Sequence, residues 1–375
     1  MIFASPRLLL VSASFDRTYG GIAICVARLA TELAQKGLEV GLWAPDGSAA
    51  TSDVIEGDCR GIVRLSGSLG DALNSFANPD IIHDNGIWLP HNHAVAETAR
   101  EAGIARIVSV HGMLEPWALK HRKLKKLMAW HLYQKRDLKS AQLLHATANT
   151  EFEAIDRMKL ANDIVVIPNG TDVPETPRLS HHRADKRVML FLSRIHPKKG
   201  LPMLLEAWAK LRPADWRLVI AGPDEGGHRT EVESLATRLD LDTVVSFLGP
   251  LNADQVSEAY NSADVFVLPT HSENFGLVVT EALAHTLPVL TTTAAPWAEL
   301  EQEKCGWSVP PTEGGIVAGL ERVFATSESA LDEMGKQGRT LVARKYAWAP
   351  VADQFISAYE RILSSHSSRL LEAKE

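Results

Sequence analysis

The chain has 375 residues, of which 45% are hydrophobic and 23% charged, so it suits two domains of ordinary globular composition. Its formal net charge of −7 disfavours nucleic acid as the main partner, because phosphate binding needs a broad positive surface. Three cysteines, Cys25, Cys59 and Cys305, show neither metal-site spacing nor a disulfide framework, which favours a reducing compartment.

Short apolar runs alternate with segments of helical period along the first half. The first run is short, interrupted by Pro6 and Arg7, so it predicts a buried strand and not a signal peptide. No stretch is apolar enough to span a bilayer. A helix is expected at 21–37, and near-continuous apolar strands between helices are typical of a parallel sheet covered on both faces. The predicted strands are residues 7–15, 38–44, 80–83, 106–110, 142–147 and 163–167.

The same pattern starts again after a segment rich in proline and charge. We therefore predict a first domain at 1–172, a linker at 173–186, a second domain at 187–348, and a C-terminal segment at 349–375 that begins as an amphipathic helix. Two doubly wound α/β domains should face each other across a cleft, where ligands bind at the carboxyl ends of the strands. The predicted strands of the second domain are residues 187–193, 216–221, 243–248, 264–268 and 288–292.

Gly20 and Gly21 follow the first strand and precede a helix. Backbone N–H groups there could approach an anion, although a simple tight turn explains the pair equally well. The loop is not a G-x-G-x-x-G, and no acid ends the second strand in the ribose-binding place, which disfavours a nicotinamide enzyme.

The loop after the first strand of the second domain, "LSRIHPKKG", carries Arg194 and Lys199. Two cations between a strand and a helix can neutralise a diphosphate, with arginine as a planar fork and lysine as a point charge. The alternative is a solvated basic loop, which suits Lys198.

The stretch "HSENFGLVVTEALA" holds two carboxylates, Glu273 and Glu281. If a helix begins near Asn274, the two acids lie roughly 12 Å apart along its axis, comparable to the reach from a sugar to the ribose of a nucleotide sugar. Glu273 could then accept bonds from sugar hydroxyls and Glu281 from ribose hydroxyls. Donor contacts are also expected from the backbone N–H groups of Asn274, Phe275, Gly276 and Leu277.

Polar residues also follow strands of the first domain. His111 comes just after a strand, so a cleft-facing role competes with the structural role usual for a lone histidine. The run His83, Asp84, Asn85 and Trp88 resembles an acceptor-side wall of hydrogen-bonding groups beside an aromatic face. The spacing of these residues matches no standard metal site, so we expect no metal.

Together these residues resemble the retaining GT-B glycosyltransferases of family 4. The E-x7-E motif is Glu273 to Glu281, and Arg194 with Lys199 is similar to the family's R-x4-K-G clamp. Gly20–Gly21 matches the N-terminal glycine loop, and "IPNGTD" (167–172) resembles the segment that closes the first domain. His111 matches the family's cleft histidine.

The resemblance implies an acceptor-side first domain, a second domain that binds a nucleotide sugar, and a C-terminal helix that crosses back to the first. It implies catalytic roles for Glu273, His111, Arg194 and Lys199, and no cofactor or metal. The chain departs from the family in "AHTLPVLTT", which lacks the usual glycine before x-P-V, and in "TTTAAPWAEL" (291–300), which replaces a common Gly-Gly segment. Both lie near the predicted donor pocket, so the donor sugar stays open.

The segment 117–141 is unusually basic. Between residues 120 and 139 eight lysines and arginines accompany one acid, Asp137, giving +7 in a chain of −7. Leu124, Leu127 and Leu132 fall on one helical stripe. A solvated helix packed on its own domain is possible, but a cationic amphipathic helix favours an anionic membrane surface or a lipid-linked acceptor. We therefore expect a cytoplasmic enzyme, peripheral on the inner face of the plasma membrane, that builds cell-surface polysaccharide or lipopolysaccharide.

Two other functions are open to the same architecture. One is a catalytically silent nucleotide-sugar-binding module, and the other is an enzyme of different chemistry, such as an epimerase or a phosphorylase. The paired acids and the two cations argue against the silent module. A phosphorylase would be favoured by a cofactor lysine on a strand-end loop, for which the sequence has no clear candidate.

Overall fold

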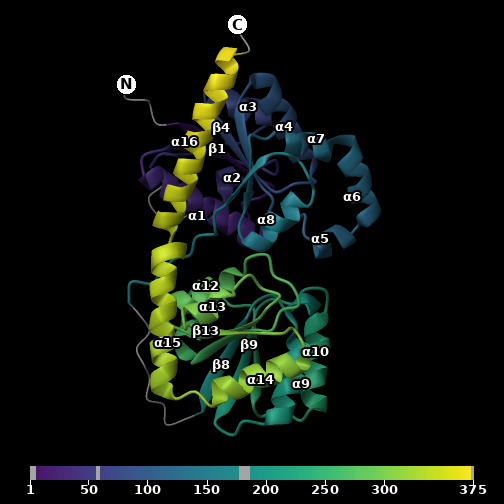
Figure 1. Cartoon of the computed structure of the whole chain (residues 1–375), viewed down its shortest axis with the longest axis vertical. Helices are drawn as coiled ribbons and strands as arrows, with labels where there is room; N and C mark the ends of the chain where they lie inside the picture. The colour runs from purple at the N-terminus through teal and green to yellow at the C-terminus, as the bar shows by residue number, and fades with distance from the viewer. Residues whose placement is uncertain (1–5, 56–59, 177–185, 373–375) are drawn as a thin grey trace. The chain divides into compact units, whose positions relative to one another are not determined.

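The computed structural model describes residues 6–55, 60–176 and 186–372. The chain divides into two compact units (Figure 1), the first of Met1–Gly170 with Trp348–Glu375 and the second of Thr171–Ala347. Most of the predicted linker lies outside the described residues. Each unit is described by itself below.

The first unit is built on a seven-stranded parallel sheet of order β3-β2-β1-β4-β5-β6-β7. The strand order reverses between β1 and β4, so right-handed crossovers place helices on both faces of the sheet. β1 is buried along almost its whole length, as its apolar sequence predicts. The strands are β1 (Arg7–Ser12), β2 (Glu39–Trp43), β3 (Ile62–Arg64), β4 (Ile81–Asn85), β5 (Ala105–Ser109), β6 (Leu143–Ala146) and β7 (Asp163–Val166).

The helices of the first unit begin and end where the sequence provides caps. α4 has Pro90 at its first turn and ends at Gly103, which adopts the left-handed conformation with φ of 65°. Helix α16 returns from the second unit and lies against α1 (Figure 1). The helices are α1 (Gly21–Gln35), α2 (Ser48–Thr51), α3 (Leu69–Ser75), α4 (Pro90–Ala102), α5 (Pro116–Lys120), α6 (Lys123–Ala129), the π-helix η2 (Trp130–Gln134), α7 (Lys135–Lys139), α8 (Asn149–Asp156), α16 (Trp348–Glu372) and the short 3-10 turn η1 (Arg17–Tyr19).

The second unit has a six-stranded parallel sheet of order β10-β9-β8-β11-β12-β13, which also reverses once. The two sheets confirm the predicted class of doubly wound α/β domains. The strands are β8 (Arg187–Leu192), β9 (Trp216–Ala221), β10 (Val245–Gly249), β11 (Val265–Leu268), β12 (Val289–Thr292) and β13 (Gly306–Val309). The helices are α9 (Leu201–Leu211), α10 (His228–Arg238), α11 (Ala253–Ser262), α12 (Leu277–Ala284), α13 (Glu299–Gln302), α14 (Glu313–Phe324), α15 (Glu328–Leu341), η3 (Pro197–Lys199) and η4 (Val342–Tyr346).

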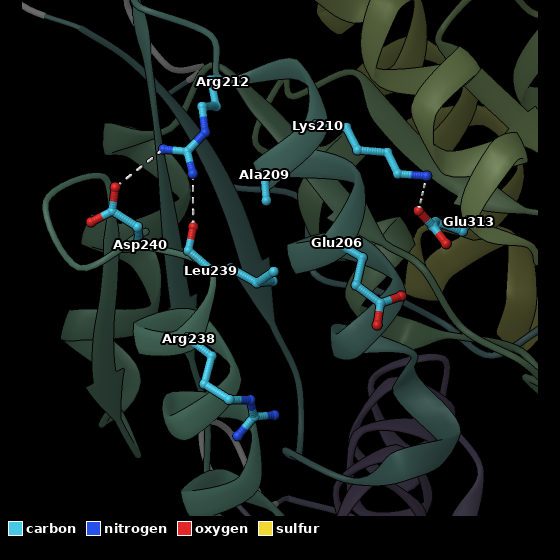
Figure 2. Close-up of a pocket in the computed structure, with 8 residues that line it drawn as sticks. All are labelled: Glu206, Ala209, Lys210, Arg212, Arg238, Leu239, Asp240 and Glu313. Carbon is cyan, nitrogen blue, oxygen red and sulfur yellow. Dashed lines mark hydrogen bonds and ion pairs between the residues drawn. The ribbon is translucent and has the colours of Figure 1, made fainter.

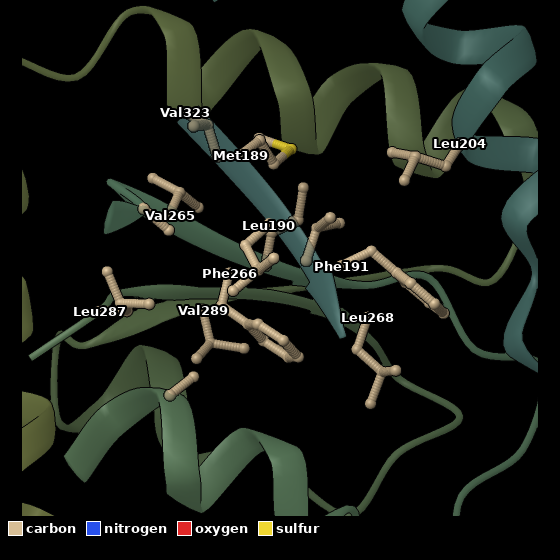
Figure 3. Packing of buried hydrophobic residues seen from close by; sticks show 14 of the residues in the cluster. Met189, Leu190, Phe191, Leu204, Val265, Phe266, Leu268, Leu287, Val289 and Val323 are labelled. Carbon is tan, nitrogen blue, oxygen red and sulfur yellow. The ribbon is translucent and has the colours of Figure 1, made fainter. Parts of the chain in front are cut away.

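The core of the second unit forms between its sheet and the covering helices. Phe191 on β8 and Phe266 on β11 are fully buried. Leu204 from α9 and Val323 from α14 pack over these strands (Figure 3). Because neighbouring strands are covered in this way, their carboxyl ends and the loops that follow them are held in fixed positions.

The structure of strand β4 differs from the predicted acceptor-side wall. Side chains alternate between the faces of a strand, so His83 and Asp84 point in opposite directions. His83 is fully buried and its Nδ1 lies 2.8 Å from Tyr359 Oη on α16. Asp84 is buried and pairs with Arg106 on β5, at 3.2 Å between Oδ2 and Nη1. Neither side chain can present itself to an acceptor, so that part of the prediction is wrong.

No helix in the described residues is both long and apolar enough to cross a membrane.

Candidate functional site

The loop between β8 and α9 depends on a glycine. Gly200 has φ of 72°, and a Cβ there would lie 1.9 Å from the carbonyl oxygen of Pro269, at the end of β11. Only glycine permits this approach. The close contact holds the cationic loop against the segment that carries Glu273.

Lys199 and Glu273 form a buried ion pair. Lys199 Nζ lies 2.5 Å from Glu273 Oε2, and their side chains are 9% and 12% exposed. The backbone N–H of Glu273 donates to the carbonyl of Ala294, which fixes the acid from the other side. The structure thus brings together two predicted site residues that are distant in sequence, and an ammonium and a carboxylate share one largely desolvated position.

Arg194 has a different partner. Its side chain is 63% exposed and its Nη1 lies 2.7 Å from Glu225 Oε2. Glu225 follows β9, and its N–H donates to the carbonyl of Ile195. Glu225 was not predicted, although an acid on the loop after a neighbouring strand is a signal for such a partner. A diphosphate would have to compete with this acid for Arg194.

Helix α12 begins later than expected. Its first residue is Leu277 and its N-cap is Gly276, with φ of 84°. The estimate of 12 Å along one helix therefore does not apply, because Glu273 lies on the preceding loop. Phe275 is buried against Trp297, whose indole N–H donates to the Phe275 carbonyl at 2.6 Å. Among the predicted donor contacts Asn274, Phe275, Gly276 and Leu277, the Phe275 side chain belongs to the core and leaves only its backbone for a ligand.

Glu281 is half-buried on α12 and held by a tyrosine. Tyr260 Oη donates to Glu281 Oε2 at 2.8 Å, and the Tyr260 ring stacks on His285. Burial raises the pKa of Glu281, while the bond from Tyr260 opposes that rise. The other carboxylate oxygen has no hydrogen-bond partner within the described ranges, so one oxygen is oriented and the other can accept from a ligand. Tyr260 was not predicted, because it lies on a different helix, α11.

The glycine that the family usually has before x-P-V is replaced in this chain, and the replacement affects the backbone. Thr286 occupies that position with φ of 60°, a conformation that is strained for a β-branched residue. Gly335 on α15 packs against this turn, since a Cβ there would lie 1.9 Å from the Thr286 carbonyl oxygen.

Thr286→Gly is therefore expected to stabilise the protein. Relief of the left-handed strain should exceed the added entropy of the unfolded chain, with a net gain of about 1 kcal/mol. Urea denaturation of the two proteins measures this difference. A matched Thr293→Gly change, on the loop after β12, should not stabilise, and equal effects at both positions would contradict the strain.

In the first unit, Gly20 and Gly21 begin α1. Gly20 has φ of 94° and a Cβ there would meet no atom within 4 Å. No side chain caps the helix at this end. The backbone N–H groups of the first turn are therefore free of a side-chain cap, as an anion loop requires and as a tight turn also allows.

His111 sits in a turn that a buried acid holds. His111 and Gly112 both adopt positive φ, of 50° and 73°. The Glu151 carboxylate accepts from the backbone N–H of Gly112, and also from the Thr147 N–H at 2.6 Å. Burial lowers the pKa of His111 to about 3, with a further contribution from His145. Glu151 was missed because its role depends on an approach from another helix.

A hydrogen-bonded chain of buried side chains crosses the same sheet. Tyr359 Oη lies 2.8 Å from His83 Nδ1, and Ser109 Oγ lies 2.6 Å from both His83 Nε2 and His145 Nδ1. His145 Nε2 lies 2.8 Å from the carbonyl of Ile167. A carbonyl only accepts, so His145 donates there, and each link then has one direction. Both histidines are neutral in this arrangement.

Because His83 and His145 are buried as neutral rings, the free energy of unfolding should decrease in acid. Burial lowers the pKa of His83 well below 6.5 and that of His145 to about 4. Between pH 6.5 and 5 the unfolded chain therefore binds protons that the folded chain excludes, and stability falls as pH falls. Each histidine contributes a slope of up to about 1.4 kcal/mol per pH unit.

Urea denaturation between pH 5 and 7.5 tests this slope. His145→Gln should make the dependence shallower by one histidine. Replacement of the exposed His271 by glutamine is the matched control and should leave it unchanged. An identical slope in all three proteins would contradict the assignment.

Trp88 lies beside the basic segment. Its ring packs on Trp130, and Lys126 Nζ lies 5.6 Å from the ring centroid. Its indole N–H donates to the Met113 carbonyl at 3.3 Å. Trp88, a member of the predicted acceptor wall, thus contacts the segment 117–141.

A charged hollow of about 410 Å³ lies elsewhere on the second unit (Figure 2). Its charges are largely paired, with Lys210 on Glu313 and Arg212 on Asp240. It is lined by the carboxyl ends of α9 and α10, which lead into the starts of β9 and β10. The hollow is therefore at the opposite edge of the sheet from the Lys199–Glu273 pair.

Within the described ranges, one acidic group has the spacing of cation ligands. Ligand atoms of His93, Glu97 and Asp137 lie within 4.8 Å of one another. Glu97 already accepts from Arg100 and Arg136, at 2.7 Å each. A cation would have to displace this positive charge, so we assign the group to the packing of α4 on α7.

Comparison with known proteins identifies the class. The model of glycosyl transferases group 1 matches residues 172–341, and that of glycosyltransferase family 4 matches residues 19–175. The D-inositol 3-phosphate glycosyltransferase of Kineococcus radiotolerans is 26% identical, over 93% of this chain and 92% of that one.

Solved structures share the fold. Sucrose-phosphate synthase from Thermosynechococcus elongatus matches with a TM-score of 0.80 and 22% identity, over 96% of this chain and 100% of the other. HepE from Anabaena, in complex with UDP and glucose, matches with a TM-score of 0.71 and 19% identity, over 95% and 99%. The architecture is that of GT-B glycosyltransferases. The chain belongs to the family 4, group 1 glycosyltransferases.

Proposed function

We propose that the protein transfers a sugar, with retention of configuration and without a metal, from a nucleoside diphosphate sugar to a hydroxyl of a glycan acceptor. The observation that carries the proposal is the buried Lys199–Glu273 ion pair at the carboxyl edge of the second sheet. The nucleotide-sugar donor agrees with the UDP and glucose bound in the HepE structure.

Lys199 and Glu273 would have different roles in sugar transfer. As the bond from the sugar to the diphosphate breaks, negative charge builds on the leaving oxygens. The Lys199 ammonium and the exposed Arg194 guanidinium would stabilise that charge without a metal. Glu273 holds the Lys199 ammonium in place before the donor binds, and its carboxylate would accept from sugar hydroxyls. The acceptor oxygen bonds to the sugar as its proton passes to the departing phosphate.

Glu281 completes the donor site at its ribose end. Tyr260 orients one carboxylate oxygen and leaves the other to accept from ribose hydroxyls. The silent module and the epimerase or phosphorylase remain alternatives. Each alternative would bind the nucleotide sugar at the same site, but none would transfer the sugar to a glycan acceptor.

Thermal-shift measurements with UDP, GDP and ADP, and then with their sugars, test the donor site. At least one nucleoside diphosphate should raise the melting temperature of the wild type. The Arg194→Ala/Lys199→Ala protein should lose that rise. Lack of stabilisation by all three in a folded wild type would overturn the donor assignment, whereas stabilisation without turnover would favour the silent module.

We further propose a lipid-linked acceptor and a position on the inner face of the plasma membrane. Leu124 on α6 and Leu132 on η2 are 76% and 77% exposed. Trp117, Leu127 and Met128 are also exposed in the same segment. Apolar side chains among lysines and arginines suit the interface of an anionic bilayer, where the apolar groups insert and the cations meet lipid phosphates.

Co-sedimentation with vesicles tests this contact. The wild type should bind vesicles rich in phosphatidylglycerol at low salt and bind phosphatidylcholine vesicles weakly. Leu124→Glu/Leu132→Glu should abolish binding. Leu248→Glu, at an exposed leucine of the second unit, is the matched control and should retain it. Failure of the wild type to bind anionic vesicles would reject the membrane contact and leave the donor site unaffected.

A further inference from the structure

We infer that Asn85 is a positioning residue that holds His111 as the Nε2–H tautomer, so that Nδ1 keeps a lone pair that can accept a hydrogen bond from a substrate hydroxyl. This inference rests on the proposed function for its ligand. The tautomer itself follows from contacts within the first unit.

The orientation of the Asn85 amide is fixed by two carbonyl groups. Asn85 Nδ2 lies 3.1 Å from the Val11 carbonyl on β1 and 3.2 Å from that of His83. Carbonyl oxygens only accept, so the amide nitrogen must face them. The reversed amide would place its oxygen against both carbonyls, and Asn85 is too buried for water to compensate. The amide oxygen therefore points away from them.

The Asn85 amide oxygen determines which ring nitrogen of His111 carries the proton. Asn85 Oδ1 lies 3.0 Å from His111 Nε2. An amide oxygen accepts and cannot donate, so His111 Nε2 must carry the proton. In the neutral ring Nδ1 then has none. Within the described residues His111 Nδ1 has no hydrogen-bond partner, and the atom is not completely enclosed by protein. A ligand can therefore reach it.

The surrounding turn keeps the ring in this place. His111 and Gly112 both have positive φ, and the Glu151 carboxylate holds the turn through the Gly112 N–H. The ring is anchored at Nε2 by Asn85 and at its backbone by this turn.

A neutral ring with a bare Nδ1 suits one kind of contact. It accepts a hydrogen bond from a hydroxyl, and it provides no positive charge for the diphosphate. The low pKa of His111 keeps the ring neutral at any working pH, which makes it a poor base for removing the acceptor's proton. The assignment makes His111 a hydrogen-bond acceptor for a substrate hydroxyl and leaves the acceptor's proton to the leaving phosphate.

The tautomer can be measured directly. Nitrogen-15 NMR of the histidine rings in the full-length protein should show His111 with a protonated Nε2 and an unprotonated Nδ1 from pH 6 to 8. Assignment comes from the signal lost in His111→Asn. A protonated Nδ1 in the wild type would overturn the inference, whether or not a donor has been identified.

Variants at position 85 then connect the tautomer to sugar transfer. Asn85→Ala should give a mixture of tautomers and raise KM for the nucleotide sugar about tenfold, as expected for one lost hydrogen bond. Asn85→Asp should raise the pKa of His111 beside the new carboxylate, protonate Nδ1, and add a loss of activity as pH falls from 8 to 6.

Asn92→Ala is the matched control. Asn92 is an equally buried asparagine of the same unit whose amide donates to Asp84 and not to His111. Its loss should lower stability while leaving the His111 signals and the KM unchanged. Equal kinetic effects at positions 85 and 92 would reduce Asn85 to a structural role and overturn the inference. Failure of the proposed function would appear differently, as a wild type with the expected tautomer and no turnover of any nucleotide sugar.

Discussion

Lys199→Ala is expected to lower the rate of sugar transfer by about 10²- to 10³-fold, the usual effect of removing one preorganised group that stabilises developing negative charge. The Lys199 side chain is only 9% exposed and its ammonium is held by Glu273. Such a charge acts on the leaving diphosphate at low dielectric and needs little reorganisation during the reaction. Alanine leaves no cation at this position, and Arg194 is engaged with Glu225.

The same change also leaves the Glu273 carboxylate buried without its partner, which lowers stability. A second variant separates the two effects. Lys199→Ala/Glu273→Gln removes both charges, so it should recover much of the stability but none of the transfer. Lys210→Ala removes a lysine that pairs with Glu313 at the opposite edge of the sheet (Figure 2) and should leave the rate unchanged. Recovery of transfer in the double variant would contradict a catalytic role for Lys199.

Arg106→Met is expected to lower the free energy of unfolding by about 3–5 kcal/mol, because it leaves a buried charge without its partner. Arg106 and Asp84 are 3% and 1% exposed and form an ion pair on neighbouring strands. The guanidinium also donates to the Asp137 carbonyl and to Ser140 Oγ, so it ties the end of α7 to the sheet. Methionine can fill the space but makes none of these bonds.

Urea denaturation measures the loss, and an exposed pair provides the control. Arg7 and Glu39 also form an ion pair in the first unit, with side chains 39% and 44% exposed. Arg7→Met should cost no more than about 1 kcal/mol. Adding Asp84→Asn to Arg106→Met should restore part of the lost stability. Equal losses for Arg106→Met and Arg7→Met would show that burial does not set the energy of the pair.

The interior strands could be predicted from the sequence because both of their faces are buried. β1 and β8 are such strands, and their apolar runs are nearly continuous. The edge strands β3 and β13 were missed. β3 has three residues, two of them exposed, and β13 contains a glycine, so neither has the length or pattern that marks a strand.

The candidate site was predictable only where its residues lie on strand-end loops. Lys199 and Glu273 follow β8 and β11, so parallel topology alone brings them to one edge. Their partners come from separate parts of the chain, and Tyr260 on α11 shows why they were missed. Its contact with Glu281 depends on how two helices pack. The acceptor wall failed for a reason visible in the sequence, since successive residues of a buried strand point to opposite faces.

The role of the Lys199–Glu273 pair is tested by the rate at which nucleoside diphosphate is formed from the nucleotide sugar that thermal shift identifies, in the presence of an acceptor lipid. The wild type should release it together with formation of glycosylated product of unchanged anomeric configuration. Glu273→Gln should still bind the nucleoside diphosphate. It should form nucleoside diphosphate from the nucleotide sugar at least about 10²-fold more slowly than the wild type. Unchanged release by folded Glu273→Gln and Lys199→Ala proteins would contradict the assignment of this ion pair as the site of sugar transfer.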